Sequence, residues 1–114
     1  MIRLTLPVPP STNVYYRNFR GRMVLSAAGK AYKASVANQS ALVKPLDGEV
    51  AITWRWFRAR KSGDLDNRSK PLKDALQGIA YHNDSQVVEE HAYRHEDKRD
   101  PRVEVTVTRL TPER

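Results

Sequence analysis

The sequence predicts a small α+β protein, in which one mixed β-sheet is covered by two main helices. Three observations lead to this fold class. The chain has 114 residues, a length that suits a single domain over residues 1–114 with a modest core. Four segments have the composition typical of strands, and two have the apolar spacing and end signals of helices. Their order is strand, basic loop, helix, strand, helix, strand, strand.

The first predicted strand lies at the N-terminus. In IRLTLPV (residues 2–8), apolar and polar side chains alternate, which predicts a strand with one buried face. The prolines of PVPPSTN (residues 7–13) end this strand, because proline cannot donate a hydrogen bond to a sheet. Residues 15–25 are rich in basic and aromatic side chains, and we expect an irregular or hairpin segment that turns near Gly21.

A helix and a buried strand come next. Residues 26–44 predict a helix, with Ser26 as its N-cap, because a serine hydroxyl can accept a free backbone N–H. Pro45 closes the segment. Residues 48–57 predict a strand, and the side chains expected on its core face are Val50, Ile52, Trp54 and Trp56.

One more helix and two strands are predicted in the second half of the chain. The helix begins near Asp66 or Asn67 and ends by Gly78, and it accommodates Pro71 only near its first turn. The strands are predicted over residues 85–95 and 101–110, on either side of a polar turn. We expect the last four residues, TPER, to be frayed.

Positive charge dominates the composition, with a formal net charge of +7 and a pI of about 10.0. No acidic residue precedes Asp47, and a basic cluster, RWFRARK (residues 55–61), leads directly to Asp64. Basic clusters mixed with aromatic residues predict a polyanion partner, and a solvated basic surface is the ordinary alternative. The side chains expected to hold phosphates are those of Arg17, Arg20, Arg22, Arg55, Arg58, Arg60 and Lys61.

The composition also excludes several classes of protein. The chain has no cysteine, which rules out disulfides and thiolate metal sites and fits a reducing cytoplasm. No stretch approaches the ~20 apolar residues of a membrane-spanning helix, so we expect a cytoplasmic protein without membrane contact. A Gly-rich phosphate loop is missing, so no nucleotide cofactor is expected. Ser26 and Ser62 lack the His and Asp partners of a nucleophilic serine.

Asp64 and Asp66 form the candidate metal site. In extended backbone, residues i and i+2 point to the same side, roughly 6.6 Å apart, which suits two carboxylates that share a hard cation such as Mg²⁺. Lys70 lies one helical turn after Asp66 and is expected over the same spot. Asp84 is the expected third acid, because it returns to the pair if the strand after it lies beside the strand at residues 48–57.

Other roles remain open for these acids. Asp64 and Asp66 could instead form an Asx turn and a helix N-cap. Asp74 could form a helical ion pair with Lys70. The residues that compete with Asp84 as the third ligand are Asp74, Glu89 and Glu90. The histidines expected as surface or nucleic-acid contacts rather than metal ligands are His82, His91 and His95.

Two stretches of the chain resemble the RusA family of Holliday junction resolvases. One is DLDNRSKPLKDALQG followed by NDSQV (residues 64–87), and the other is LPVPPSTNVYYR followed by GRMVLSAAGKAY (residues 6–32). The resemblance runs from about Leu6 to Val107. It implies a RusA-like fold and a homodimeric, Mg²⁺-dependent endonuclease, in which Mn²⁺ can substitute. It also implies a four-way DNA junction as substrate, resolved by paired nicks in recombination and repair, and relatives in prophages.

The resemblance further implies roles for individual residues. The family's catalytic and metal-binding aspartates fall on Asp64, Asp66 and Asp84, and its catalytic lysine falls on Lys70. Asn67 completes the Asp-x-Asp-Asn motif and is expected to orient a ligand. The chain departs from the pattern at two positions that bear on DNA contacts or metal affinity. Many relatives carry a basic residue where this chain has Gly63, and some carry an acid where it has Asn83.

The leading hypothesis is therefore a metal-dependent, structure-selective DNA endonuclease. In it, Lys70 either neutralises charge on the phosphate or positions the attacking water. The alternative from another class is a non-catalytic junction-binding or architectural protein. A less selective nuclease, or one directed at RNA, keeps the chemistry and changes the substrate.

Overall fold

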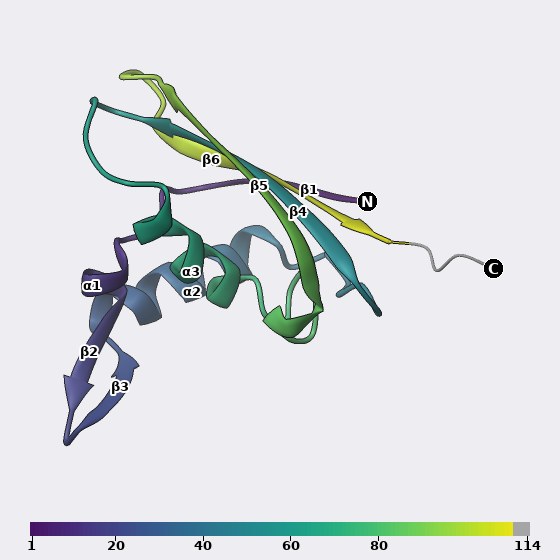
Figure 1. The fold of residues 1–114 in the computed structure, drawn as a ribbon, viewed down its shortest axis with the longest axis horizontal. Helices are drawn as coiled ribbons and strands as arrows, with labels where there is room; N and C mark the ends of the chain where they lie inside the picture. Colours follow the sequence, from purple (N-terminus) through teal and green to yellow (C-terminus); the bar gives the residue numbers. More distant parts are fainter. Residues whose placement is uncertain (111–114) are drawn as a thin grey trace.

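The computed structural model describes residues 1–110, so the predicted fraying of TPER lies outside the described residues. Figure 1 shows a four-stranded sheet with the helices gathered on one of its faces. The helices are α1 (Thr12–Tyr15), α2 (Ala27–Gln39), α3 (Asp66–Ala75) and the short 3₁₀-helix η1 (Asp84–Gln86). The strands are β1 (Ile2–Leu6), β2 (Tyr16–Phe19), β3 (Arg22–Leu25), β4 (Val50–Arg58), β5 (Val87–Glu96) and β6 (Arg102–Arg109). The α+β class with a mixed sheet is confirmed.

The main sheet has the strand order β1-β6-β4-β5. β6 pairs antiparallel with both β1 and β4, so that Val105 lies opposite Leu4 on one side and Trp54 on the other. β4 and β5 are parallel, with Trp54 opposite Ala92. Parallel neighbours need a crossover connection, and α3 supplies it. This β4–α3–β5 unit carries most of the candidate site residues.

Strict alternation places the core between the sheet and the helices. Along β4 the predicted face is buried, and Trp54 is wholly so, whereas Arg55 on the opposite face is exposed. Burying a large apolar side chain contributes on the order of 1.5–3 kcal/mol, so this face does most to fix α2 and α3 against the sheet. The large core side chains contributed by the helices are Tyr15 from α1, Tyr32 and Val36 from α2, and Leu72 and Leu76 at the end of α3.

β2 and β3 form the hairpin predicted around Gly21. Arg20 and Gly21 both have positive φ, 53° and 77°, as two-residue hairpin turns require. Figure 1 shows the hairpin extending beyond the helices, away from the main sheet. The guanidinium groups of Arg17 and Arg20 lie 5.1 and 5.2 Å from the ring centre of Phe19, so the exposed tip is both basic and aromatic.

α2 begins as predicted and ends early. The Gly29 N–H donates to the Ser26 hydroxyl over 3.0 Å, which confirms the N-cap. The helix ends at Gln39, five residues before the predicted end at residue 44. The segment from Asn38 to Ser40 is polar, and such side chains favour turns because they compete for backbone hydrogen bonds.

Pro71 lies deeper in α3 than expected. It is the sixth residue of the helix, beyond the first turn to which the sequence argument confined it. Proline lacks the N–H that would bond the carbonyl four residues back, here that of Asn67. That carbonyl accepts a hydrogen bond from the Thr12 hydroxyl over 3.1 Å, which compensates for the missing helical bond.

Among residues 1–110, none of the helices combines the length and apolar composition that crossing a membrane requires.

Candidate active site

Asp64 and Asp66 flank the start of α3. Asp64 lies in the loop after β4, Asp66 is the first helical residue, and both are exposed. Leu65 between them has helical backbone angles, φ −56° and ψ −42°. The expectation of an extended segment, with both carboxylates on one side, was therefore wrong: the helix starts early enough to turn the chain between them.

Both carboxylates of this pair lack protein partners. Within residues 1–110, neither Asp64 nor Asp66 accepts a side-chain hydrogen bond or joins an ion pair. Leu65 occupies the N-cap position and makes no side-chain cap. The alternative assignment as an N-cap is therefore wrong. The pair consists of two exposed, negatively charged groups that do not stabilise the helix by capping it.

Lys70 points along α3 to another acid. Its Nζ lies 3.3 Å from Asp74 Oδ2, in the i,i+4 ion pair that was the alternative role for Asp74. The ammonium also lies 5.1 Å from the ring centre of Tyr16. The side chain remains 62% exposed, which leaves the amine able to turn toward a ligand.

Asp84 returns to this same part of α3. It is the first residue of η1, capped by Asn83, and its backbone N–H donates to Gln77 Oε1 over 2.9 Å. The pKa of Asp74 is raised to about 6, mainly by burial and also by the side-chain hydrogen bond with Asp84 and the negative charge of Asp84. Lys70, Asp74 and Asp84 thus form one contiguous cluster.

The structure does not bring Asp84 to Asp64 and Asp66. β5 lies beside β4 as expected, but the two strands are parallel, so their amino ends lie at the same end of the sheet. Asp84 comes just before the amino end of β5, whereas Asp64 comes after the carboxyl end of β4. Along α3, Asp66 and Asp74 are eight residues apart, ~12 Å at 1.5 Å per residue. Within residues 1–110, no three Asp, Glu or His side chains are placed to hold one metal ion together.

Glu90 has a structural position that the sequence did not indicate. Its carboxylate accepts hydrogen bonds from Trp54 Nε1 (2.9 Å), Ser69 Oγ (2.5 Å) and Lys73 Nζ (2.9 Å). Burial alone would raise the pKa of Glu90, but these bonds and the Lys73 charge lower it. The residue ties α3 to the edge of the sheet and has its oxygens occupied, so it is a poor competitor for a metal.

The predicted phosphate contacts fall in three places. Arg58, Arg60 and Lys61 belong to the end of β4 and the loop that leads to Asp64. Arg55 lies on the opposite face of the sheet from α3, 4.3 Å from the Tyr93 ring centre. The three arginines that the hairpin contributes are Arg17, Arg20 and Arg22.

Arg68 was missed by the sequence argument. It lies in the first turn of α3, and its Nη1 donates to the Pro9 carbonyl over 2.6 Å. Its guanidinium lies 5.0 Å from the Trp56 ring centre. A helical position between Asp66 and Lys70 gave no signal that the side chain turns back to the sheet, because that contact depends on tertiary packing.

Together these features define a class of protein: a small, basic α+β domain whose exposed carboxylates and arginines suit contacts with a hard cation and a polyanion. Oxygen donors without protein partners are what such a cation requires.

The chain belongs to the RusA family, because the family model described as "Endodeoxyribonuclease RusA" matches residues 7–108. This confirms the family predicted from the sequence motifs. Crossover junction endodeoxyribonuclease RusA of Escherichia coli strain K12 is 36% identical over 115 residues, covering 94% of this chain and 93% of that protein. The corresponding protein of Enterobacteria phage 82 is 37% identical with the same coverage. That of Shigella sonnei strain Ss046 is 35% identical, again over 94% and 93%.

Proposed function

We propose that this protein is a Mg²⁺-dependent, structure-selective endonuclease that resolves four-way DNA junctions by paired nicks in recombination and repair. One observation carries the proposal: two exposed carboxylates without protein partners, Asp64 and Asp66, follow a basic loop in a member of the RusA family. A carboxylate pair in a chain of charge +7 repels DNA unless a cation lies between them.

The proposal assigns a role to each site residue. Asp64 and Asp66 at the start of α3, and Asp84 separately beside Asp74, supply oxygen ligands for one or two Mg²⁺ ions, or Mn²⁺ in their place, and Asn67 orients a ligand. The bound ion would supply a Lewis acid and an activated water for phosphodiester hydrolysis. Lys70 neutralises charge on the scissile phosphate or positions the water. Its exposed amine, held at 3.3 Å by Asp74, supports either role, because a short rotation frees it for the substrate.

Phosphate contacts come from the basic side chains of the hairpin, β4 and the loop after it. Each phosphate that they neutralise releases counterions, so binding should weaken steeply as salt rises. The assigned residues are Arg17, Arg20, Arg22, Arg55, Arg58, Arg60 and Lys61.

A homodimer is part of the proposal. Paired nicks on opposed strands need two active sites, and the chain carries a single Asp-x-Asp pair of this kind. An isologous dimer matches the approximate two-fold symmetry of a four-way junction. The absence of cysteine supports a cytoplasmic location for this assembly.

The test uses a synthetic four-way junction with an immobile core and a matched linear duplex. Purified protein is added with Mg²⁺, or with EDTA as control, and nicks are mapped on all four strands. Symmetric paired nicks on the junction, absent from the linear duplex and from the EDTA reaction, are expected. Equal cutting of the duplex or of RNA would instead assign a less selective nuclease.

The alternative is a non-catalytic junction-binding or architectural protein. A specific observation favours it: within residues 1–110, the acids are not gathered into a three-ligand group. Tight junction binding without any Mg²⁺-dependent nick would establish this function and reject the endonuclease.

A further inference from the structure

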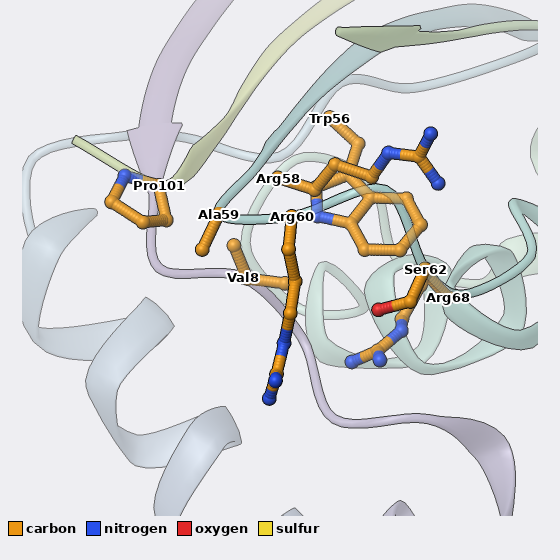
Figure 2. Close-up of a pocket in the computed structure, with 8 residues that line it drawn as sticks. All are labelled: Val8, Trp56, Arg58, Ala59, Arg60, Ser62, Arg68 and Pro101. Atoms are coloured by element: carbon orange, nitrogen blue, oxygen red, sulfur yellow. The ribbon is translucent and has the colours of Figure 1, made fainter. Parts of the chain in front are cut away.

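A pocket of about 270 Å³ lies beside the loop that carries Asp64. Figure 2 shows it between the end of β4, the following loop, α3 and the segment after β1. None of its lining residues is acidic. Those that matter here are Val8, Trp56, Arg58, Arg60, Ser62 and Arg68.

The pocket wall holds nitrogen donors without acceptors. Among residues 1–110, Trp56 Nε1, Arg58 Nε and Arg68 Nε are buried and have no hydrogen-bond partner. Trp56 is only 3% exposed, and Figure 2 shows its indole nitrogen on the side of the ring that faces Arg60. Buried donors without acceptors are destabilising, so a ligand that brings oxygen acceptors would stabilise this wall.

The charge at the pocket is also unbalanced. Arg58 pairs with Glu96 at 3.5 Å, whereas Arg60 and Arg68 have no carboxylate partner in the part of the chain that the structure describes. Burial lowers the pKa of Arg68, as expected for a guanidinium drawn out of water without a counter-charge. In Figure 2 the guanidinium groups of Arg60 and Arg68 point the same way, and that of Arg58 points to the other side of Trp56.

We propose that this pocket binds a phosphodiester group of the DNA, held by Arg60 and Arg68 and by the indole N–H of Trp56. The inference rests on the proposed function, because it takes DNA as the substrate. An anion with several oxygen acceptors matches a site that offers positive charge and N–H donors and has no acidic residue. The indole N–H is shielded at present, so a bound oxygen reaches it after a side-chain shift, for which the exposed Arg60 has freedom.

The pocket is connected to the acidic pair through a short stretch of backbone. Ser62 precedes Asp64 by two residues, and Arg68 follows Asp66 by two. Between them, the Gly63 carbonyl accepts hydrogen bonds from Arg58 and Arg94, each over 3.3 Å. A phosphate in the pocket would therefore belong to the strand that passes the acidic pair, a neighbour of the phosphate held there.

The two tryptophans provide a direct test by NMR on the full-length ¹⁵N-labelled protein. Trp54 Nε1 already donates to Glu90, so its indole signal is an internal control. The signals are assigned with Trp→Phe variants, and EDTA is present so that cleavage plays no part. The probes are inorganic phosphate and a short DNA duplex, added separately.

We expect the Trp56 indole signal to shift with both probes and the Trp54 signal to stay in place. Arg68→Gln should abolish the shift, whereas Arg68→Lys should retain part of it. The matched control, Arg109→Gln, removes the same charge at the opposite end of the sheet and should leave the shift intact. An unchanged Trp54 signal also reports that each variant is folded.

Three results would overturn the inference: no shift at Trp56, equal shifts at both indoles, or a shift with inorganic phosphate and none with DNA. A binding titration gives a second readout. Arg68→Gln should reduce the slope of log affinity against log salt by about 0.9, the value for one phosphate contact, and Arg109→Gln should not. A Trp56 response in a protein that never nicks junctions would reject the proposed endonuclease and leave the phosphate pocket standing.

Discussion

The acidic side chains near the two ends of α3 differ in whether they have partners within the protein. At the amino end, Asp64 and Asp66 are exposed and have no partner within residues 1–110. Toward the carboxyl end, Asp74 is paired with Lys70, and Glu90 of the adjacent strand accepts three hydrogen bonds. Partnered carboxylates hold a fold together, whereas unpartnered ones are available to a ligand. Replacing Asp64 or Asp66 should therefore change activity, whereas replacing Asp74 or Glu90 should mainly change stability.

Asp66→Asn tests the amino end and should have the largest effect. Neutralising one proposed ligand should reduce Mg²⁺-dependent junction nicking by about 100-fold or more, ~2.7 kcal/mol at 1.36 kcal/mol per tenfold. Because the side chain is exposed and unpartnered, the free energy of unfolding should change by less than ~0.5 kcal/mol. Nicking assays and urea unfolding measure the two quantities, and junction binding should persist. Loss of binding and stability together would show that Asp66 has a folding role.

Glu90→Ala tests the partnered end. It leaves the buried Trp54 Nε1 without an acceptor and removes the link to Ser69 and Lys73, so unfolding should be easier by about 2–3 kcal/mol. The neighbouring Glu89 is 54% exposed and has only a long contact to His91, at 3.5 Å. Glu89→Ala should cost less than ~0.5 kcal/mol in the same urea titration. Equal costs for the two variants would contradict the proposed link between α3 and the sheet.

Gly63→Ala tests how closely the loop between β4 and α3 packs against Trp56. Gly63 has a φ of 94°, and an added Cβ would lie 2.8 Å from the buried Trp56 ring. Left-handed backbone and the forced shift should together cost about 2 kcal/mol of unfolding free energy. Gly48→Ala is the matched control, because its φ of 76° is also positive but the nearest atom is 3.9 Å away. Its cost should be only ~1 kcal/mol, and the difference isolates the contact with Trp56.

Asp74→Asn should have the smallest effect, visible mainly as a change in pH dependence. The pKa of Asp74 rises from 3.8 to about 6 on folding, so the folded state holds the proton more tightly. Protonation of Asp74 therefore stabilises the folded state. This contribution to the free energy of unfolding is fully present below pH ~4 and is lost as pH rises through about 6. After allowance for solvent screening, the loss should be roughly 1 kcal/mol in metal-free buffer. Asp74→Asn should flatten this decline in unfolding free energy measured from pH 4 to 7, and an unchanged decline would assign it to other groups.

Local features of the fold were predictable from the sequence, and long-range ones were not. The buried face of β4, the Ser26 cap and the turn at Gly21 depend on neighbouring residues, and all three are confirmed. The parallel direction of β5, which separates Asp84 from Asp64, is decided by how distant segments pack. A motif places residues along the chain, whereas strand direction decides which end of the sheet each one reaches.

The candidate site divides in the same way. Residue type and spacing predicted roles for the acids, the lysine and the basic loop, and these roles stay predictions. The sequence did not show that Leu65 adopts helical angles, because an Asp-x-Asp pair before a helix is compatible with either conformation. Nor could it show that Arg68 lies against Trp56, a contact between segments twelve residues apart that only the packing of α3 on β4 creates.

The strand order has a consequence for synthesis of the chain. Within residues 1–110, β1 pairs with β6, which lies far from it along the chain, and β6 also stands between β1 and β4. The sheet therefore cannot be completed until β6 has been made, and until then β1 lacks the strand with which it pairs. Contacts this distant along the chain are slow to form. A chain truncated before residue 102 would lack the strand that joins β1 to β4 and β5.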